Sequence, residues 1–144
     1  MVESRRFLVV DDNREFAEDL CELLALQGNH ATVAVDAEEA LQHLEHESFH
    51  GLFTDLRLPG QSGVELMEEL NRRGLDMPTV LITAYADENV VQRAQSAGAI
   101  EILSKPLDIE RWLDLARRLT ISAQSTPAND AESPSADSEP RDQS

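Results

Sequence analysis

The sequence predicts an α/β fold, in which a parallel sheet of five strands is covered by five helices within residues 1–121 of the 144-residue chain. Short apolar segments typical of strands alternate with longer segments whose apolar residues recur at helical spacing. Asparagine or aspartate precedes several helical segments and glycine follows several, as is usual at helix ends. Because strands that alternate with helices are joined by right-handed crossovers, the sheet is expected to be parallel.

The expected strands are short, and their composition separates the centre of the sheet from its edge. Residues 7–10 are an unbroken apolar run, as expected for a strand that is buried on both faces. The second segment, 30–35, is more polar, which favours an edge position. The expected strands are residues 7–10, 30–35, 51–54, 78–82 and 99–103.

The expected helices have apolar stripes and recognisable start or stop signals. Asn13 can cap the first helix and Gly28 can end it, and Phe16 belongs to its apolar stripe. Asp36 and Glu39 have the spacing of a capping box, in which two side chains bond the first backbone amides of a helix. The expected helices are residues 14–27, a segment that begins after Asp36, residues 64–73, residues 88–97 and a segment that begins near Asp108.

The charge and composition of the chain exclude several partners. The formal net charge is −16 at pH 7, and binding to nucleic acid requires clustered lysine and arginine, so no direct nucleic-acid contact is expected. No apolar run approaches the roughly 20 residues of a membrane span, so no membrane partner is expected. The single cysteine, Cys21, is expected to pack in the core, and a reducing cytoplasm fits this cysteine usage.

Residues 122–144 differ from the rest of the chain in composition. They contain no large apolar residue, and they have six serines, three prolines and five acidic residues against one basic residue. Such a segment cannot bury enough surface to offset its ordering entropy, so a disordered acidic tail or linker is expected. The sequence leaves open whether the chain is a stand-alone domain or a piece of a longer protein.

Polar side chains stand at the ends of four expected strands. Asp11 and Asp12 follow the first strand, Asp55 the third, Thr83 the fourth and Lys105 the fifth. The carboxyl ends of parallel strands meet at one edge of a sheet, where ligands bind in open α/β folds. Three converging carboxylates need a counter-ion, and Mg²⁺ is suited to oxygen ligands. The edge therefore suits a hard cation and a phosphoryl group, which a lysine can contact as a point charge.

Each of these residues also has a structural interpretation when it is taken alone. The aspartate pair can end a strand and cap a helix, and Lys105 before Pro106 can be a turn residue with a solvated ammonium group. Thr83 can be an ordinary strand-end hydroxyl. Their combination at one edge favours a functional site over these interpretations. Plain helix caps explain three other aspartates, namely Asp36, Asp87 and Asp108.

Five segments in this order make residues 4–121 similar to the response-regulator receiver domains of two-component signalling. The segments are FLVVDD at 7–12, DLRLPGQSGVEL at 55–66, LITA at 81–84, AGA at 97–99 and KP at 105–106. The resemblance implies a flavodoxin-like fold with the strand order 2-1-3-4-5. It also implies a cytoplasmic signalling protein that is no general enzyme and catalyses only its own phosphorylation and dephosphorylation.

The resemblance further implies a role for each site residue. Asp55 is the nucleophile that accepts a phosphoryl group from a histidine kinase or a histidine phosphotransfer protein. Asp12 and Asp55 bind Mg²⁺ directly, together with the backbone carbonyl of Arg57, and Asp11 acts through a metal-bound water. Lys105 pairs with Asp55 and then with a phosphoryl oxygen.

The resemblance places a switch next to this site. Thr83 moves to bond another phosphoryl oxygen, and this shifts the loop that starts at Ala84. Tyr85 lies where the family controls access to the site, and Pro106 follows the lysine. Receivers usually carry tyrosine or phenylalanine three residues before that lysine, whereas this chain has Ile102. A signal carried by an inward ring rotation is therefore not expected here.

The expected output is a changed surface for a downstream protein or a second copy of the chain, formed by residues 88–97, residues 99–103 and the last helix. Three competing interpretations are weaker. A pseudo-receiver that ignores phosphate is disfavoured because every expected site residue is present. An aspartyl-phosphate phosphatase usually shows Asp-x-Asp, and Asp55 is followed by Leu56 and Arg57. A nucleotide-binding fold lacks its glycine-rich phosphate loop.

Overall fold

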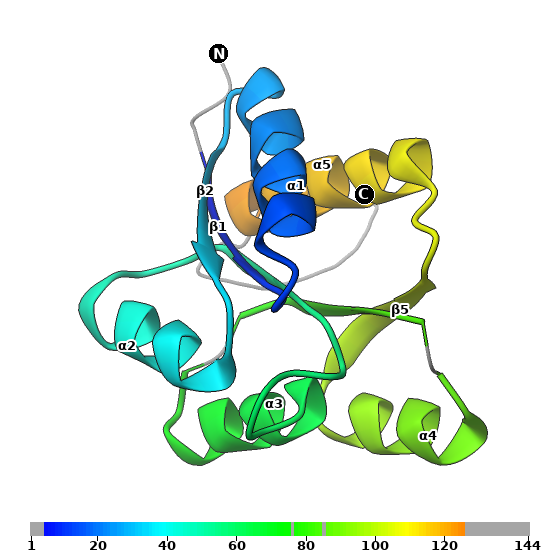
Figure 1. Cartoon of the computed structure of the whole chain (residues 1–144). Coiled ribbons are helices and arrows are strands. Elements are labelled where there is room, and N and C mark those ends of the chain that lie inside the picture. The colour runs from blue at the N-terminus through cyan, green and yellow to red at the C-terminus, as the bar shows by residue number, and fades with distance from the viewer. Residues whose placement is uncertain (1–4, 76, 85, 126–144) are drawn as a thin grey trace, which may run out of the picture.

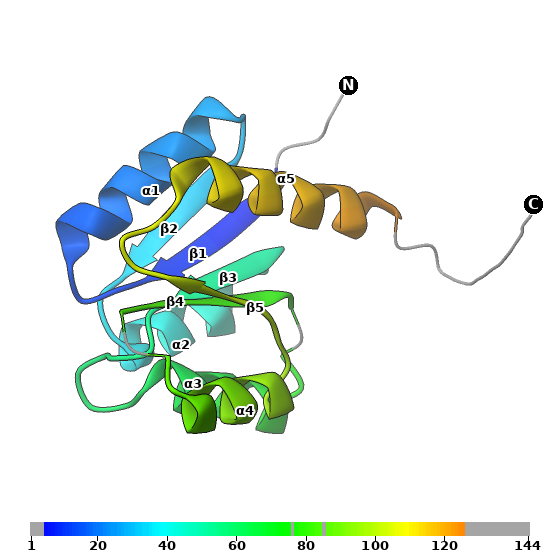
Figure 2. The ribbon, with the colours of Figure 1, turned by 90° about the vertical axis from the view of Figure 1, so that its right-hand side faces the viewer.

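The computed structural model describes residues 5–75, 77–84 and 86–125, which form three layers with the sheet in the middle (Figure 1). Helices α1 and α5 cover one face of the sheet, and α2, α3 and α4 cover the other (Figure 2). The expected α/β class is confirmed. The elements are β1 (Arg6–Val10), α1 (Arg14–Leu26), β2 (His30–Ala34), α2 (Ala37–His46), β3 (Gly51–Thr54), α3 (Gly63–Arg72), β4 (Thr79–Thr83), α4 (Glu88–Ser96), β5 (Ala99–Ser104) and α5 (Ile109–Ser125).

The strands are parallel and lie in the order β2-β1-β3-β4-β5, which confirms the order implied by the resemblance. The more polar β2 lies at an edge, as its composition predicted. Val10 of β1 pairs with Thr54 of β3, and Thr54 pairs with Leu81 of β4. Because these strand ends are nearly level, the residues that follow β1 and β3 leave the sheet at the same edge.

The central strands are fixed by apolar cores on both faces of the sheet. Phe7 of β1 faces α1 and α5, and its neighbour Leu8 faces α2 and α3, which is the alternation of a strand buried on both sides. The ring of Phe53 on β3 lies 5.5 Å from that of Phe7 and 5.4 Å from that of Trp112 on α5. These contacts help to fix the positions of β1 and β3. The aspartates that follow these two strands are therefore fixed as well.

The expected helix caps are present, with one difference. The side chains of Asn13, Asp36 and Asp87 accept hydrogen bonds from backbone amides of the first turn of α1, α2 and α4. The predicted capping box at α2 is incomplete, because Glu39 accepts from the amide of Val35 rather than from that of Asp36. A complete capping box occurs at the start of α3, between Ser62 and Glu65.

The last helix runs past residue 121, the predicted end of the domain. Helix α5 continues to Ser125, so residues 122–125 are helical rather than part of a disordered tail. Neither glycine nor proline interrupts the chain between Asp108 and Thr126, so nothing in that stretch breaks a helix. The remaining part of the predicted tail, 126–144, lies outside the described residues.

Cys21 was expected to pack in the core, and it is partly buried against the core between α1 and α5. Burial, with a smaller effect of Glu18, raises the pKa of its thiol to about 11, so the thiol stays protonated at neutral pH. Within the described ranges, none of the helices combines the length and apolar character needed to span a membrane.

Candidate functional site

The structure brings the three aspartates together at the carboxyl edge of the sheet. Asp11, Asp12 and Asp55 each offer a carboxylate oxygen, and these oxygens lie within 4.8 Å of one another. Asp11 is 3% exposed and Asp55 is 9% exposed, whereas Asp12 is open to solvent. The cluster therefore has two buried carboxylates at its base and one at its mouth.

Backbone hydrogen bonds that extend the sheet hold the two buried aspartates. The amide of Asp11 donates to the carbonyl of Ala34 at 3.0 Å, and the amide of Asp55 donates to that of Val10 at 2.9 Å. The hydroxyl of Thr54 donates to the carbonyl of Asp55 at 3.0 Å. Both carboxylates therefore stand on the rigid strand ends and not on a free loop, which suits a site that must keep its geometry.

Lys105 supplies the counter-charge at the base of the cluster. Its Nζ donates to Oδ2 of Asp11 at 2.8 Å and to Oδ2 of Asp55 at 3.1 Å. Burial by itself lowers the pKa of Lys105, but the hydrogen bonds to Asp11 and Asp55 outweigh it, and the pKa is raised. The ammonium group is therefore charged at neutral pH. Lys105 thus bridges the two buried carboxylates of the cluster.

The backbone of Lys105 is tied to the end of β4. Its amide donates to the carbonyl of Thr83 at 3.0 Å, and Thr83 pairs with Ser104 across β4 and β5. Thr83 itself is 1% exposed. The peptide bond between Lys105 and Pro106 is cis. Lys105 and Thr83 are thus linked by one backbone hydrogen bond.

Two neighbours of the site, the α1 cap Asn13 and Phe16 on the first turn of α1, were not predicted as site residues. The amide of Asn13 donates to Oδ1 of Asp11 at 2.9 Å, so this helix cap also orients a site carboxylate. The ring of Phe16 lies with its centroid 4.7 Å from Nζ of Lys105, within the range of a cation–π contact. The sequence identified Asn13 as a helix cap and Phe16 as part of an apolar stripe, but it did not indicate that Phe16 contacts Lys105.

The loop after Asp55 returns to the site through a glycine. The amide of Gly63 donates to the carbonyl of Leu56 at 2.8 Å, and an added Cβ at Gly63 would lie 2.1 Å from the carbonyl oxygen of Asp55. Only glycine permits this approach, which starts α3 directly against the site. The amide of Arg57 faces Oδ1 of Asp55 at 3.3 Å.

No contact with the aspartate cluster is described for the remaining predicted site residues Ala84, Ile102 and Pro106. Ala84 and Pro106 are exposed, and Ile102 is partly buried on the face of β5 that packs toward α3 and α4. Tyr85 lies outside the described residues. The side chain of Arg57 is exposed.

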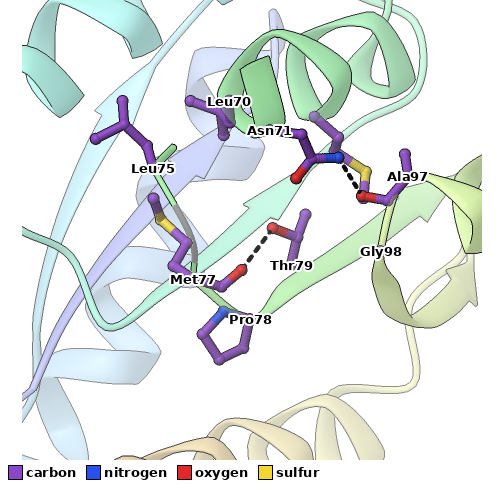
Figure 3. Close-up of a pocket in the computed structure, with 9 residues that line it drawn as sticks. Leu70, Asn71, Leu75, Met77, Pro78, Thr79, Ala97 and Gly98 are labelled. Atoms are coloured by element: carbon purple, nitrogen blue, oxygen red, sulfur yellow. Dashed lines mark hydrogen bonds between the residues drawn. The ribbon is translucent and has the colours of Figure 1, made fainter. Parts of the chain in front are cut away.

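A separate cavity of about 560 Å³ lies at the amino end of the strands, opposite to the aspartate cluster. Figure 3 shows the residues that line it. It is lined by the end of α3, the start of β4 and the end of α4. Asn71 donates to the carbonyl of Ala97 at 2.8 Å there, and Thr79 donates to that of Met77 at 3.2 Å (Figure 3). Because these residues lie at the amino end of β4, the cavity takes no part in the aspartate site.

The fold and the acidic edge together define a class of signalling domain, and comparison with known families agrees. Residues 7–117 match the family model described as response regulator receiver domain, so the chain belongs to that family. The predicted family is confirmed.

Among its relatives, the chain is 39% identical over 111 residues to a response regulator receiver protein of Anaeromyxobacter sp. (strain Fw109-5), covering 77% of this chain and 47% of that one. It is 37% identical over 114 residues to the response regulator protein FleR of Pseudomonas aeruginosa, covering 78% of this chain and 24% of that one. The chain thus spans about half, or less, of the length of these curated relatives.

Among solved structures, a receiver domain protein of Methanospirillum hungatei JF-1 described as CheY-like superposes with a TM-score of 0.80. The two chains are 25% identical, and the match covers 85% of this chain and 98% of the other. The shared architecture of five parallel strands and five helices therefore extends over nearly all of a known receiver.

Proposed function

We propose that the chain is a phosphorylation switch, in which Asp55 accepts a phosphoryl group from a histidine kinase or a histidine phosphotransfer protein. The observation that carries the proposal is the buried Asp55 carboxylate, held beside Asp11 and Asp12 and bonded by Lys105. An oxygen of Asp55 attacks phosphorus, and a new O–P bond forms as the N–P bond of phosphohistidine breaks. The departing imidazole keeps the electron pair of that bond and takes up a proton.

The donor set at this edge fits Mg²⁺. Each of the three aspartates offers a carboxylate oxygen, and these oxygens lie within 4.8 Å of one another, which suits a cation that prefers oxygen ligands. Asp12 and Asp55 would hold the ion directly with the backbone carbonyl of Arg57, and Asp11 would hold it through water. The bound ion supplies charge neutralisation for the transferring group.

The residues of the chain position and stabilise the product. When the phosphoryl group arrives, the ammonium group of Lys105 exchanges its bond to Asp55 for one to a phosphoryl oxygen, while Asp11 retains it. Thr83 donates its hydroxyl to a second phosphoryl oxygen. Phosphoryl transfer depends mainly on positioning and charge stabilisation, so this small set of groups is sufficient for it.

Helix α4 is the element best suited to respond to a displacement of Thr83. Ala94 is its single buried residue, and a cavity of about 380 Å³ lies between it and β5, with Val91 and Ile102 in its lining. Arg93 of α4 donates two hydrogen bonds of 2.9 and 3.0 Å to Glu68 on α3, and the side chain of Arg93 is exposed to solvent. An element with so few buried contacts is displaced at low free-energy cost.

The output surface follows from this arrangement. With Ile102 in place of an aromatic residue, no ring rotates inward, and the shift passes through the start of α4 and through packing against β5. The surface of α4, β5 and α5 then changes for a downstream protein or a second copy of the chain. The population shift is expected to be small until such a partner binds.

Phosphorylation by a small donor tests the proposal. The full chain, incubated with acetyl phosphate and Mg²⁺, should gain one acid-labile phosphoryl group by intact-mass measurement, and Asp55→Asn should gain none. Asp36→Asn is the matched control, because asparagine still caps α2 and this carboxylate is not one of the three in the cluster. A wild-type chain that stays unmodified by acetyl phosphate and by histidine kinases would favour a pseudo-receiver.

A further inference from the structure

Four contacts form a closed ring between α1 and the end of β5. Nζ of Lys105 donates to Oδ2 of Asp11 at 2.8 Å, and Oδ1 of Asp11 accepts from the amide of Asn13 at 2.9 Å. The side chain of Asn13 accepts from the amide of Phe16 at 3.1 Å, and the Phe16 ring lies 4.7 Å from Nζ of Lys105. Besides Asp55, the ammonium group thus has Asp11, which the amide of the α1 cap orients, and the aromatic face of Phe16 on α1 as neighbours.

The aromatic face is an independent constraint on the lysine. A lysine side chain has four rotatable bonds, and hydrogen bonds alone leave the ammonium group free to follow a moving carboxylate or a solvent molecule. The ring attracts the cation through its quadrupole, and the partly buried Phe16 is itself anchored in the core between α1 and α5. At a partly exposed site such a contact corresponds to about a two- to fivefold change in an equilibrium constant.

We propose that Phe16 is a positioning residue, whose ring holds the ammonium group of Lys105 between Asp11 and Asp55. This inference rests on the proposed phosphorylation of Asp55. It goes beyond that function because it assigns a role in the site to an apolar residue of α1. The proposal predicts that replacing Phe16 by a non-aromatic residue slows phosphoryl transfer but tightens Mg²⁺ binding.

The first consequence concerns phosphoryl transfer. Without the ring, the ammonium group of Lys105 spends less time beside Asp55. In a smaller fraction of collisions with a donor, Lys105 is therefore in position to bind a phosphoryl oxygen. Transfer at saturating Mg²⁺ should therefore slow by about two- to fivefold in Phe16→Leu. Leucine still fills the core contact but offers no π face.

The second consequence concerns Mg²⁺. Lys105 bonds Asp11 and Asp55, which also belong to the carboxylate set that suits the metal, so the ammonium group and Mg²⁺ compete for them. A lysine held less firmly competes less, so Phe16→Leu should bind Mg²⁺ more tightly by about two- to fivefold. A substitution that merely disordered the start of α1 would disturb Asp11 and weaken Mg²⁺ binding.

The experiment measures both quantities on the full chain. Mg²⁺ affinity is obtained by calorimetry without any phosphodonor, and the phosphorylation rate is obtained with acetyl phosphate at saturating Mg²⁺. Wild type, Phe16→Leu and Phe16→Tyr are compared, since tyrosine retains the aromatic face. We expect slower transfer with tighter Mg²⁺ binding in Phe16→Leu, and values close to wild type in Phe16→Tyr.

Three results of these comparisons would overturn the proposal. Unchanged values in Phe16→Leu would show that the ring does not hold the lysine. Weaker Mg²⁺ binding with slower transfer, or a tyrosine variant that behaves like leucine, would assign Phe16 a packing role only. If wild type is not phosphorylated at all, the proposed function fails, whereas the Mg²⁺ comparison still decides the role of Phe16.

Discussion

Gly63→Ala tests whether the start of α3 is fixed against Asp55. The added Cβ would lie 2.1 Å from the Asp55 carbonyl oxygen and 3.1 Å from its carbonyl carbon, and both are backbone atoms that cannot rotate away. Helix α3 must therefore move by about 1 Å to reach an allowed separation. Overpacking of this kind costs about 1–3 kcal/mol, which for a domain of this size lowers the melting temperature by about 4 °C per kcal/mol.

The phosphorylation rate separates a displaced site from a general loss of stability. A misplacement of about 1 Å can slow a reaction by about 100-fold, so Gly63→Ala should react much more slowly with acetyl phosphate. Gly60→Ala is the matched control: Gly60 has φ +83° with no atom within 4 Å of an added Cβ, so alanine costs about 1–2 kcal/mol of strain away from Asp55. Equal phosphorylation rates in the two folded variants would refute the reasoning.

Three further predictions address the metal, the relay and the end of the chain. Asp11→Asn removes an outer-shell partner of the metal and should weaken Mg²⁺ binding by about 10–100-fold. Asp12→Asn removes a direct ligand and should weaken Mg²⁺ binding more. An unchanged Mg²⁺ affinity of Asp12→Asn in calorimetry would show that Asp12 does not bind the metal. Beryllofluoride should shift amide resonances of α4 and α5 in wild type but far less in Thr83→Ala, and equal shifts would exclude Thr83 as the relay. Deleting residues 126–144, which contain no large apolar side chain, should leave the melting temperature nearly unchanged, and a fall of many degrees would contradict this.

Local sequence signals sufficed for the acidic edge because β1, β3 and β5 are followed at once by a charged residue and β4 ends in a threonine. Apolar runs located Asp11, Asp55 and Lys105, and the parallel order then placed their side chains together. Caps were equally local, so Asn13 and Asp87 were predicted from the residues beside them. Such features depend on a few neighbouring residues and need no knowledge of tertiary packing.

Contacts between distant segments could not be predicted in this way. The approach of Phe16 to Lys105 depends on how α1 lies over the end of β5, which no spacing along the chain encodes. The close approach of Gly63 to Asp55 depends on the path of the loop that starts α3. Helix α5 extended past the predicted boundary because a polar composition was interpreted as disorder, although no residue there stops a helix.

Asp55 is proposed as the residue that carries the phosphoryl group. After reaction of the full chain with acetyl phosphate and Mg²⁺, borohydride reduces an aspartyl phosphate to homoserine, and fragmentation of the resulting peptides locates the reduced residue. Homoserine at position 55, together with none at positions 11 and 12, is the predicted result. Homoserine at position 11 or 12, or at any other aspartate, in place of position 55 would contradict the account.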